Sequence, residues 1–441
     1  MNSPLLKKPK LVTEKVKIGS YRWTICALLF AATTINYLDR QVMGLLKPAL
    51  EQQFSWTESD YAAIVTAFTA AYALSMVVFG RFIDKIGTKM GYSISIVVWS
   101  VAAMAHAAAR STFGFGVARA ALGAGESGNF PAAVKTVAEW FPKKERALAT
   151  GIFNSGANVG AVAAPIIVPW ILGVYGWQEA FIITGAIGFV WLAFWLYYYD
   201  TPAKQKRLSQ AEYDYIHSDD DAASLEAEEK PLKWSKLLFI RQTWVFICGK
   251  FFTDPIWYFF LFWLPSYFST TFQLDLSKPS LPLAIVYTAT TVGSIGGGYL
   301  SSYFINKGWP VFKARKTAML IIALLVVPIM LARYTSDIWV AVGLISLAAA
   351  AHQAWSANIY TIVSDMFPKK AVSSVVGIGG MAGSVSGALF PLFIGFILDY
   401  YKVLGNLVAG YNIIFTICGL AYLVAWLVIH FLSPKMKQVE L

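Results

Sequence analysis

Charged residues are scarce in this chain of 441 residues. Asp, Glu, Lys and Arg make up 14% of it, whereas apolar residues make up 57%. A typical soluble domain is about a quarter charged, and a single soluble core stops growing near about 250–300 residues. A soluble protein of this composition would expose large apolar patches to water. The shortage of charge therefore excludes a soluble globular enzyme and a disordered protein, and it predicts a polytopic membrane protein.

Cysteine and histidine are also rare, with three and four residues respectively. Cys26, Cys248 and Cys418 each lie in an apolar run, so no disulfide framework is expected. The sequence holds no metal-spaced His/Cys cluster and no nucleophile-elbow motif, which argues against an integral-membrane enzyme. We therefore expect neither a metal nor a cofactor, and we interpret the net charge of +11 as a topology signal rather than a nucleic-acid-binding surface.

Long apolar runs dominate the rest of the chain. A helix needs about 20 such residues to cross the hydrocarbon core of a bilayer, and twelve runs are long enough. The predicted fold class is therefore all-α, with twelve transmembrane helices. Their predicted ranges are 20–48, 58–80, 88–109, 113–138, 146–172, 178–199, 243–270, 281–305, 316–334, 337–363, 371–398 and 408–432.

Basic residues between these runs are unevenly distributed. The even-numbered connections and both tails hold most of the 36 Lys and Arg residues. Because basic loops tend to stay in the cytoplasm, both termini are predicted to be cytoplasmic, in the cell (inner) membrane. Residues 1–22 lack the cleavage site of a signal peptide, so the first helix is expected to be retained. The odd-numbered connections hold only Lys47, Arg110, Lys278, Arg333 and Lys402.

An internal repeat divides the chain. Phe-Pro-Lys-Lys occurs at 141–144 and again at 367–370, and the same offset maps Gly151 onto Gly377 and Pro165 onto Pro391. Two parallel six-helix halves are typical of transporters that rock about a midplane site. We therefore predict an N-terminal half with its tail, a cytoplasmic linker interpreted as solvated with a short surface helix, and a C-terminal half with its tail. Their ranges are 1–199, 200–242 and 243–441.

Two local features bear on helix movement. Gly156-xxx-Gly160 and Gly379-xxx-Gly383-xxx-Gly387 occupy matching halves and allow close helix crossings, and we expect them to be sliding or rocking seams. Pro255 lies within the seventh predicted helix, where it removes a backbone hydrogen bond and allows a bend.

Several motifs resemble a known family. Gly80-Arg-Phe-Ile-Asp84-Lys-Ile-Gly87-Thr-Lys89 is similar to the loop signature of the major facilitator superfamily. Asn36-Tyr37-Leu38-Asp39-Arg40 and Arg119-Ala-Ala-Leu-Gly-Ala-Gly-Glu126 are similar to its anion:cation symporter branch. Ala351-His352-Gln353-Ala354 is most similar to the hexuronate transporters of that branch. Galactonate-type relatives carry Gln where this chain has Ala157, which disfavours that assignment.

Ionisable residues at membrane depth are costly and usually face a wet cavity. The first and fourth predicted helices carry Asp39, Arg40, Arg119 and Glu126, and either acid could pair across helices with either arginine. Lys250 and Asp254 are four residues apart on one helix and can touch. Two interpretations stay open for these groups. They are structural ion pairs, or they couple proton binding to anion binding.

The second interpretation has a physical basis. Burial in a low-dielectric cavity raises the pKa of a carboxyl group, and a nearby arginine lowers it again. An arginine that moves onto a substrate carboxylate therefore releases its acid to take a proton. The resemblance implies that Asp39 and Glu126 are the protonated pair, with Arg40 and Arg119 coupled to them. It also implies that Arg81 and Asp84 latch the cytoplasmic gate.

The resemblance implies a sugar acid as substrate, which needs a cation, hydrogen-bonding groups and flat apolar surfaces. Arg40 and Lys250 can supply the cation. His352 either hydrogen-bonds the substrate or fills the core, and each aromatic has a core or interfacial position as its alternative. The remaining candidates are Tyr37, Tyr72, Asn158 and Asn358 for the hydroxyl groups, and Trp257, Tyr258 and Trp355 for the C–H face.

The sequence therefore predicts a monomeric secondary transporter that takes up hexuronate with protons by alternating access. Its expected partners are a small organic anion, protons and the lipid bilayer. Two alternatives stay open. One is a symporter for another organic anion, such as an aldonate or an aromatic acid, and the other is a membrane sensor that does not transport.

Overall fold

The computed structural model describes residues 18–219, 234–274 and 280–439, and these residues form helices without strands. The parts of the tails at 1–17 and 440–441, and the acidic part of the linker at 220–233, lie outside the described residues. In the N-terminal half the elements are α1 (Tyr21–Phe54), α2 (Glu58–Ile86), α3 (Thr88–Ala105), η1 (His106–Ala108), α4 (Thr112–Glu126), α5 (Asn129–Trp140), α6 (Lys143–Val174) and α7 (Trp177–Tyr198).

The linker and the C-terminal half follow. The linker contains η2 (Pro202–Lys204), α8 (Gln210–Ile216) and α9 (Trp234–Leu237). The C-terminal half contains α10 (Arg241–Phe262), α11 (Leu264–Phe272), α12 (Leu281–Asn306), α13 (Val311–Val326), η4 (Val327–Tyr334), α14 (Ile338–Met366), α15 (Val372–Val403) and α16 (Leu407–Leu432).

All twelve predicted spans are helical, which confirms the fold class. Eight continuous helical segments of the described chain are long and apolar enough to cross a membrane by length and composition alone. Some spans are broken into two pieces. The span over 113–138 is interrupted between α4 and α5. The seventh span is interrupted at Trp263, between α10 and α11 and two residues before Pro265. The expected bend at Pro255 is not where this helix breaks, since α10 runs through that residue.

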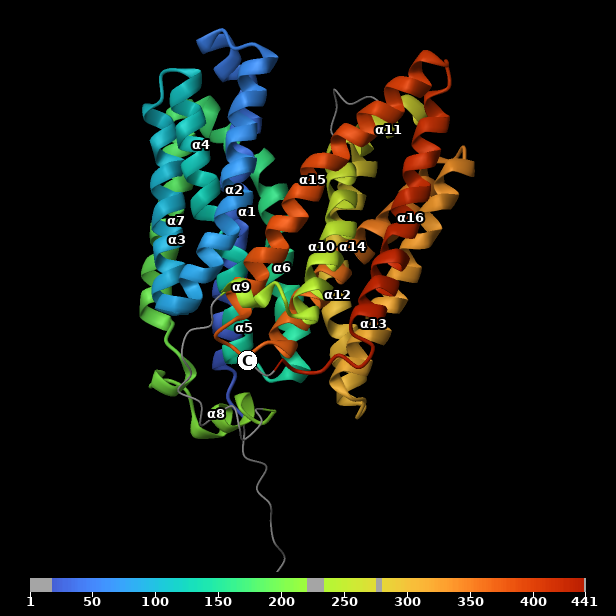
Figure 1. Ribbon diagram of the computed structural model, residues 1–441. Helices are drawn as coiled ribbons and strands as arrows, with labels where there is room; N and C mark the ends of the chain where they lie inside the picture. Colours follow the sequence, from blue (N-terminus) through green and yellow to red (C-terminus); the bar gives the residue numbers. More distant parts are fainter. Residues whose placement is uncertain (1–17, 220–233, 275–279, 440–441) are drawn as a thin grey trace, which may run out of the picture.

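The two halves lie side by side, as Figure 1 shows: α1–α7 in blue to green, and α10–α16 in yellow to red. They meet at the end of the molecule that carries α8 and the described start and finish of the chain. At the opposite end, near α11, they stand apart. We call these the terminal end and the far end.

Glycines bring the halves into contact near the terminal end. A Cβ on Gly80 of α2 would meet the carbonyl oxygen of Ser373 on α15, and one on Gly377 would meet that of Met76. Gly151 of α6 and Gly298 of α12 make the corresponding approaches in the other seam. The two seams follow the internal repeat, because Gly151 is the repeat partner of Gly377.

The glycine seams expected from the sequence lie elsewhere. Gly156 and Gly160 pack against α1 within the N-terminal half, and Gly383 and Gly387 pack against Asp254 and Tyr258 of α10 within the C-terminal half. These predicted seams therefore join helices of the same half, and other glycines form the seams between the halves. Close packing there holds each half together as a unit, since these crossings join helices of the same bundle.

The described part of the linker is bonded to the N-terminal half as well as solvated. The carboxylate of Glu212 on α8 is buried and accepts the backbone N–H groups of Tyr21 and Arg22 at 3.0 and 3.1 Å. It thereby caps the start of α1, where the helix dipole favours a negative charge. The Arg22 side chain bridges Glu212 and Glu145 at 3.0 and 2.7 Å. The linker is thus fastened to the N-terminal half.

Candidate functional site

A cavity of about 420 Å³ lies between the two halves. Residues of α1, α2, α4, α5 and α6 line one wall, and residues of α10, α14 and α15 line the other. Its floor lies toward the terminal end, where the rings of Phe130 and Tyr360 from opposite halves stack at 5.2 Å. The lining continues toward the far end as far as Tyr61 and Leu261. The cavity therefore extends toward the end at which the two halves stand apart.

Most of the residues predicted from the sequence to bind substrate line this cavity. Two do not: Trp355 is buried against Tyr422 of α16, and Asn358 donates to the carbonyl oxygens of Gly297 and Ala354. Both lie on faces of α14 that are turned away from the cavity. The predicted residues that line it are Tyr37, Arg40, Tyr72, Asn158, Lys250, Trp257, Tyr258 and His352.

The N-terminal wall presents a cation to the cavity. The guanidinium of Arg40 forms an ion pair with Glu126 of α4 at 2.8 Å and lies 4.7 Å from the ring centres of both Tyr37 and Tyr72. The Arg40 side chain is 25% exposed, whereas that of Glu126 is fully buried. The structure thus selects one of the four pairings that the sequence left open, and it connects two different helices.

The other two charged residues of this set lie close by. Arg119 also lines the cavity and donates to the backbone carbonyl of Arg40 at 3.2 Å. Asp39 points away from the cavity, and Thr184 and Arg119 are among its neighbours. Neither carboxylate oxygen of Asp39 has a hydrogen-bond partner among the described residues, and Oε1 of Glu126 lacks one as well. Unpartnered buried carboxyl oxygens are unusual and need an explanation.

The C-terminal wall presents an acid instead. Nζ of Lys250 lies 2.8 Å from Oδ2 of Asp254, one turn further along α10, and 4.6 Å from the ring centre of Tyr360. The Lys250 side chain is 7% exposed and that of Asp254 is 19% exposed. The carboxylate, rather than the ammonium, is therefore the more accessible member of this pair.

Three amide side chains connect the two walls deep in the cavity. Asn154 of α6 donates to Oε1 of Gln353 on α14 at 2.9 Å, and Gln353 donates to Oδ1 of Asn158 at 3.3 Å. Amides offer both donors and acceptors, which suits a ligand with several hydroxyl groups.

An aromatic platform lies beside these amides. The rings of Trp257 and His352 stack at 5.2 Å, and Nδ1 of His352 lies 2.5 Å from the hydroxyl of Tyr422. His352 is thus both a cavity-lining residue and a packing residue, so the two alternatives for it are compatible.

The terminal end is closed by the acid predicted to act at the gate. Asp84 of α2 pairs with Lys135 of α5 at 2.9 Å and accepts the backbone N–H groups of Ser373 and Ser374 at 3.3 and 2.7 Å. Since α15 begins at Val372, the carboxylate of one half sits on a helix N-terminus of the other, where the helix dipole favours an anion. Arg81, the other predicted gate residue, is half-buried on the same helix.

An ion pair across the halves was not predicted. Asp365 of α14 accepts from Arg146 of α6 at 3.2 Å and from Arg315 of α13 at 3.0 Å, and Arg315 also donates to the carbonyl oxygen of Lys143 at 2.7 Å. All three charged side chains are buried. The repeat offered a signal, because Asp365 precedes the second Phe-Pro-Lys-Lys just as Glu139 precedes the first.

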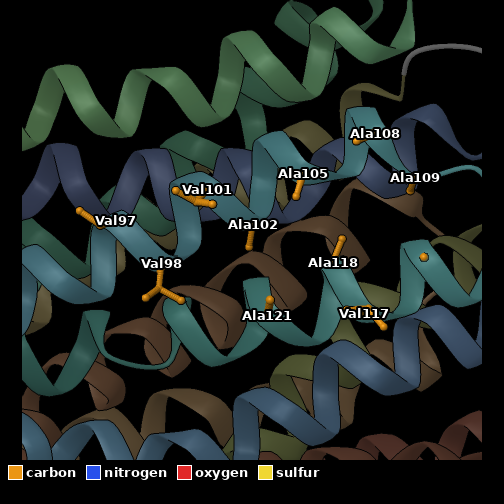
Figure 2. Close-up of a pocket in the computed structure, with 11 residues that line it drawn as sticks. Val97, Val98, Val101, Ala102, Ala105, Ala108, Ala109, Val117, Ala118 and Ala121 are labelled. Atoms are coloured by element: carbon orange, nitrogen blue, oxygen red, sulfur yellow. The ribbon is translucent and has the colours of Figure 1, made fainter.

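Another hollow lies on the outer face of the N-terminal half. Figure 2 shows its lining, which consists of Val and Ala side chains from α3, η1 and α4 and includes Val101, Ala105 and Val117. Val101 and Val117 are more than half exposed. Nothing in this lining can bind a charge or a hydroxyl group, so the cavity between the halves is the candidate site.

Two six-helix bundles around a central polar cavity, closed at one end by ionic contacts, define a membrane transporter. Residues 29–391 match the Major Facilitator Superfamily, and the chain belongs to that family. It is thus a multi-pass membrane protein and a transporter rather than an enzyme, as the sequence predicts.

Several curated proteins are similar over most of the chain. The hexuronate transporter of Escherichia coli K12 is 33% identical over 426 residues, which cover 96% of each protein. The galacturonate transporter of Dickeya chrysanthemi is 34% identical over 65% of this chain and 84% of its own length. The D-galactonate transporter of Escherichia coli O6:H1 is 30% identical over 87% of this chain and 91% of its own.

Solved structures share the fold at lower identity. A proton:xylose symporter superimposes with a TM-score of 0.71 at 14% identity, covering 95% of this chain and 97% of its own. The human organic anion transporter MFSD10 superimposes with a TM-score of 0.70 at 13% identity, covering 93% of this chain and 100% of its own. The E. coli fucose:proton symporter superimposes with a TM-score of 0.67 at 15% identity, covering 94% of this chain and 100% of its own.

Proposed function

We propose that this chain is a proton-coupled symporter that takes up hexuronate-type sugar acids by alternating access. The observation that carries the proposal is the Arg40–Glu126 ion pair. A cavity-facing cation is held by a fully buried acid on another helix. An incoming carboxylate can therefore take over Arg40 and leave Glu126 without its counter-ion.

The coupling step follows from that exchange. A buried carboxylate without a partner costs far more than the neutral acid, so Glu126 takes up a proton when the substrate occupies Arg40. The unpartnered oxygens of Asp39 support a second proton site next to it. Arg119, between the two acids, links them electrostatically. Proton uptake and anion uptake are then one event.

The remaining lining supports a polyhydroxylated substrate. Asn154, Asn158 and Gln353 can exchange their mutual hydrogen bonds for bonds to hydroxyl groups. Trp257 and Tyr258 offer flat surfaces to the C–H face of a sugar. Similarity to transporters named for hexuronate and galacturonate favours a hexuronate over an aldonate. Trp355 and Asn358 are not part of the site that we propose.

We further propose that both termini are cytoplasmic, in the inner membrane, as the distribution of basic residues predicts. The cavity then faces outward in this state, and Asp84 and Asp365 hold its cytoplasmic end shut. We take residues 1–199 and 243–441 as the two rocking units of a monomer, joined by the linker 200–242. Opening inward requires the bonds of both acids across the halves to break.

Uptake into proteoliposomes tests the proposal. Purified protein in vesicles with an inward pH gradient should accumulate labelled galacturonate, and unlabelled galacturonate should compete better than unlabelled galactonate. Arg40→Gln should remove the accumulation, whereas Arg110→Gln should keep it, because Arg110 lies outside the cavity and donates to the backbone carbonyls of Ala107 and Ala109. Stronger competition by galactonate would overturn the substrate assignment, and uptake that ignores the pH gradient would overturn the coupling.

A further inference from the structure

The Lys250–Asp254 pair is not needed for the coupling step just described, yet both residues line the cavity. The pair lies within one helix, so a rigid movement of one half against the other cannot separate it. Lys250 is covered by Asp254 on one side and by the ring of Tyr360 on the other. The pair therefore stays intact when one half moves against the other.

The exposed side of this pair is negative. Lys250 is the bonding partner of Asp254 in the described part of the chain, through Oδ2, which leaves Oδ1 without a bond there. A Cβ on Gly383 of α15 would collide with the Asp254 carboxylate, so only a glycine at that position lets the carboxylate lie where it does. The C-terminal wall is thus built to hold a carboxylate at the cavity surface.

Asp254 and Arg40 line the same cavity from opposite halves. Tyr258, which also lines the cavity, is within electrostatic range of both Arg40 and Asp254. A six-carbon sugar acid bound to Arg40 by its carboxylate therefore turns its other end toward the C-terminal wall. An ionised carboxylate there accepts hydrogen bonds from hydroxyl groups and repels a second carboxylate.

We infer that Asp254 determines specificity by accepting hydroxyl groups of a mono-acid sugar and repelling diacids that carry a carboxylate at each end. Lys250 acts as a positioning residue that keeps Asp254 ionised and oriented. The inference rests on the proposed function, since it takes Arg40 as the site of the first carboxylate. It separates two substrate classes that share carbon number and hydroxyl groups and differ in the charge of one end.

Binding to the purified protein tests this inference, with galacturonate as the mono-acid and galactarate as the diacid. Wild type should prefer galacturonate by about tenfold or more. Asp254→Asn removes the repelling charge and exposes Lys250, so the preference should fall by at least about tenfold, with tighter galactarate binding. Glu51→Gln is the matched control, because Glu51 forms an i, i+4 pair with Lys47 on α1 outside the cavity and should leave the preference unchanged.

A second variant guards against misfolding caused by an unpaired lysine. Lys250→Met combined with Asp254→Asn removes both charges, and its preference should lie between those of wild type and Asp254→Asn. This order follows from charge, and a purely structural role of the pair would not produce it. An unchanged ratio in both variants would overturn the inference alone. A wild-type chain that does not bind galacturonate would overturn the proposed function, and the inference with it.

Discussion

The two walls of the cavity come from repeated halves, yet they expose opposite charges. In the N-terminal wall the exposed member of the ion pair is the cation, Arg40, and its acid is hidden on another helix. In the C-terminal wall the exposed member is the acid, Asp254, and its cation is hidden on the same helix. An ion pair between helices can exchange partners, whereas a pair within one helix is fixed. On this difference rests our proposal that one half couples proton and anion while the other recognises the far end of the substrate.

The internal repeat shows how the charges of the two halves differ. His352 occupies the position in the C-terminal half that corresponds to Glu126. There it stacks on Trp257 and bonds to Tyr422, so it is a packing residue of the cavity wall and not a counter-ion. A symmetric backbone thus carries an asymmetric set of charges.

The largest expected effect comes from removing the hidden acid of the N-terminal wall. Glu126→Gln should abolish gradient-driven accumulation of galacturonate, because a neutral amide cannot take up a proton when the substrate displaces Arg40. Counterflow exchange, which needs no net proton movement, should continue. Glu51→Gln is the control. Accumulation at the wild-type level in the Glu126→Gln variant would contradict the coupling role of the Arg40–Glu126 pair.

Removing the exposed cation should weaken binding of the acid itself, in addition to removing accumulation. Arg40→Gln should lower the affinity for galacturonate by about 10- to 100-fold, since a hydrogen bond to a charged group contributes about 1.5–3 kcal/mol. Calorimetry with galacturonate and with neutral galactose separates the charge from the shape of the ligand. Equal losses for the two ligands, or native affinity for the acid, would contradict the role of Arg40.

The two halves also differ at the terminal end, where the N-terminal half contributes Asp84 and the C-terminal half contributes Asp365. Asp365→Asn should favour inward opening more than Asp84→Asn does, because it leaves Arg146 and Arg315 buried without a counter-ion, whereas Asp84→Asn leaves one lysine. A cysteine placed at Ser294 in the α6–α12 seam can report opening by its labelling rate in a Cys248→Ser background, because Cys248 is half-buried whereas Cys26 and Cys418 are buried. Equal rates in the two variants would remove the distinction between the two acids.

The smallest expected effect tests the boundary of the C-terminal wall. Trp355→Phe should change galacturonate affinity by less than about twofold, because the ring packs against Tyr422 and does not line the cavity. Trp257→Phe, on the cavity-lining ring, should have the larger effect. A greater loss from the change at Trp355 would mean that this side chain reaches the substrate in another state.

Most of the fold could be predicted from the sequence because the bilayer imposes a minimum length on every span. The twelve apolar runs correspond to twelve helical spans, and the repeat indicates the two halves. The breaks were harder to place. Pro255 is tolerated inside α10, while the neighbouring Pro265 coincides with a break, and the choice depends on packing between helices.

The site could be predicted only in part. Charge in an apolar run identified Arg40, Glu126, Lys250 and Asp254, because such residues are costly unless they have a role. Which of them pair, and which face the cavity, depends on helix rotation. In α14 every residue from Ala351 to Met366 is buried, so no polar face indicates its orientation. Trp355 and Asn358 were therefore assigned to the cavity wrongly, and the contact of Asp365 with Arg146 was missed.

The most direct test of the account follows protons and substrate in the same vesicles. Proteoliposomes that contain a pH-sensitive dye, with no imposed gradient, should acidify inside when galacturonate is added outside, in proportion to the label taken up. The Glu126→Gln variant should exchange label without acidification. Uptake of galacturonate by the wild-type protein with no proton entry would contradict the claim that substrate and proton exchange partners at Arg40 and Glu126.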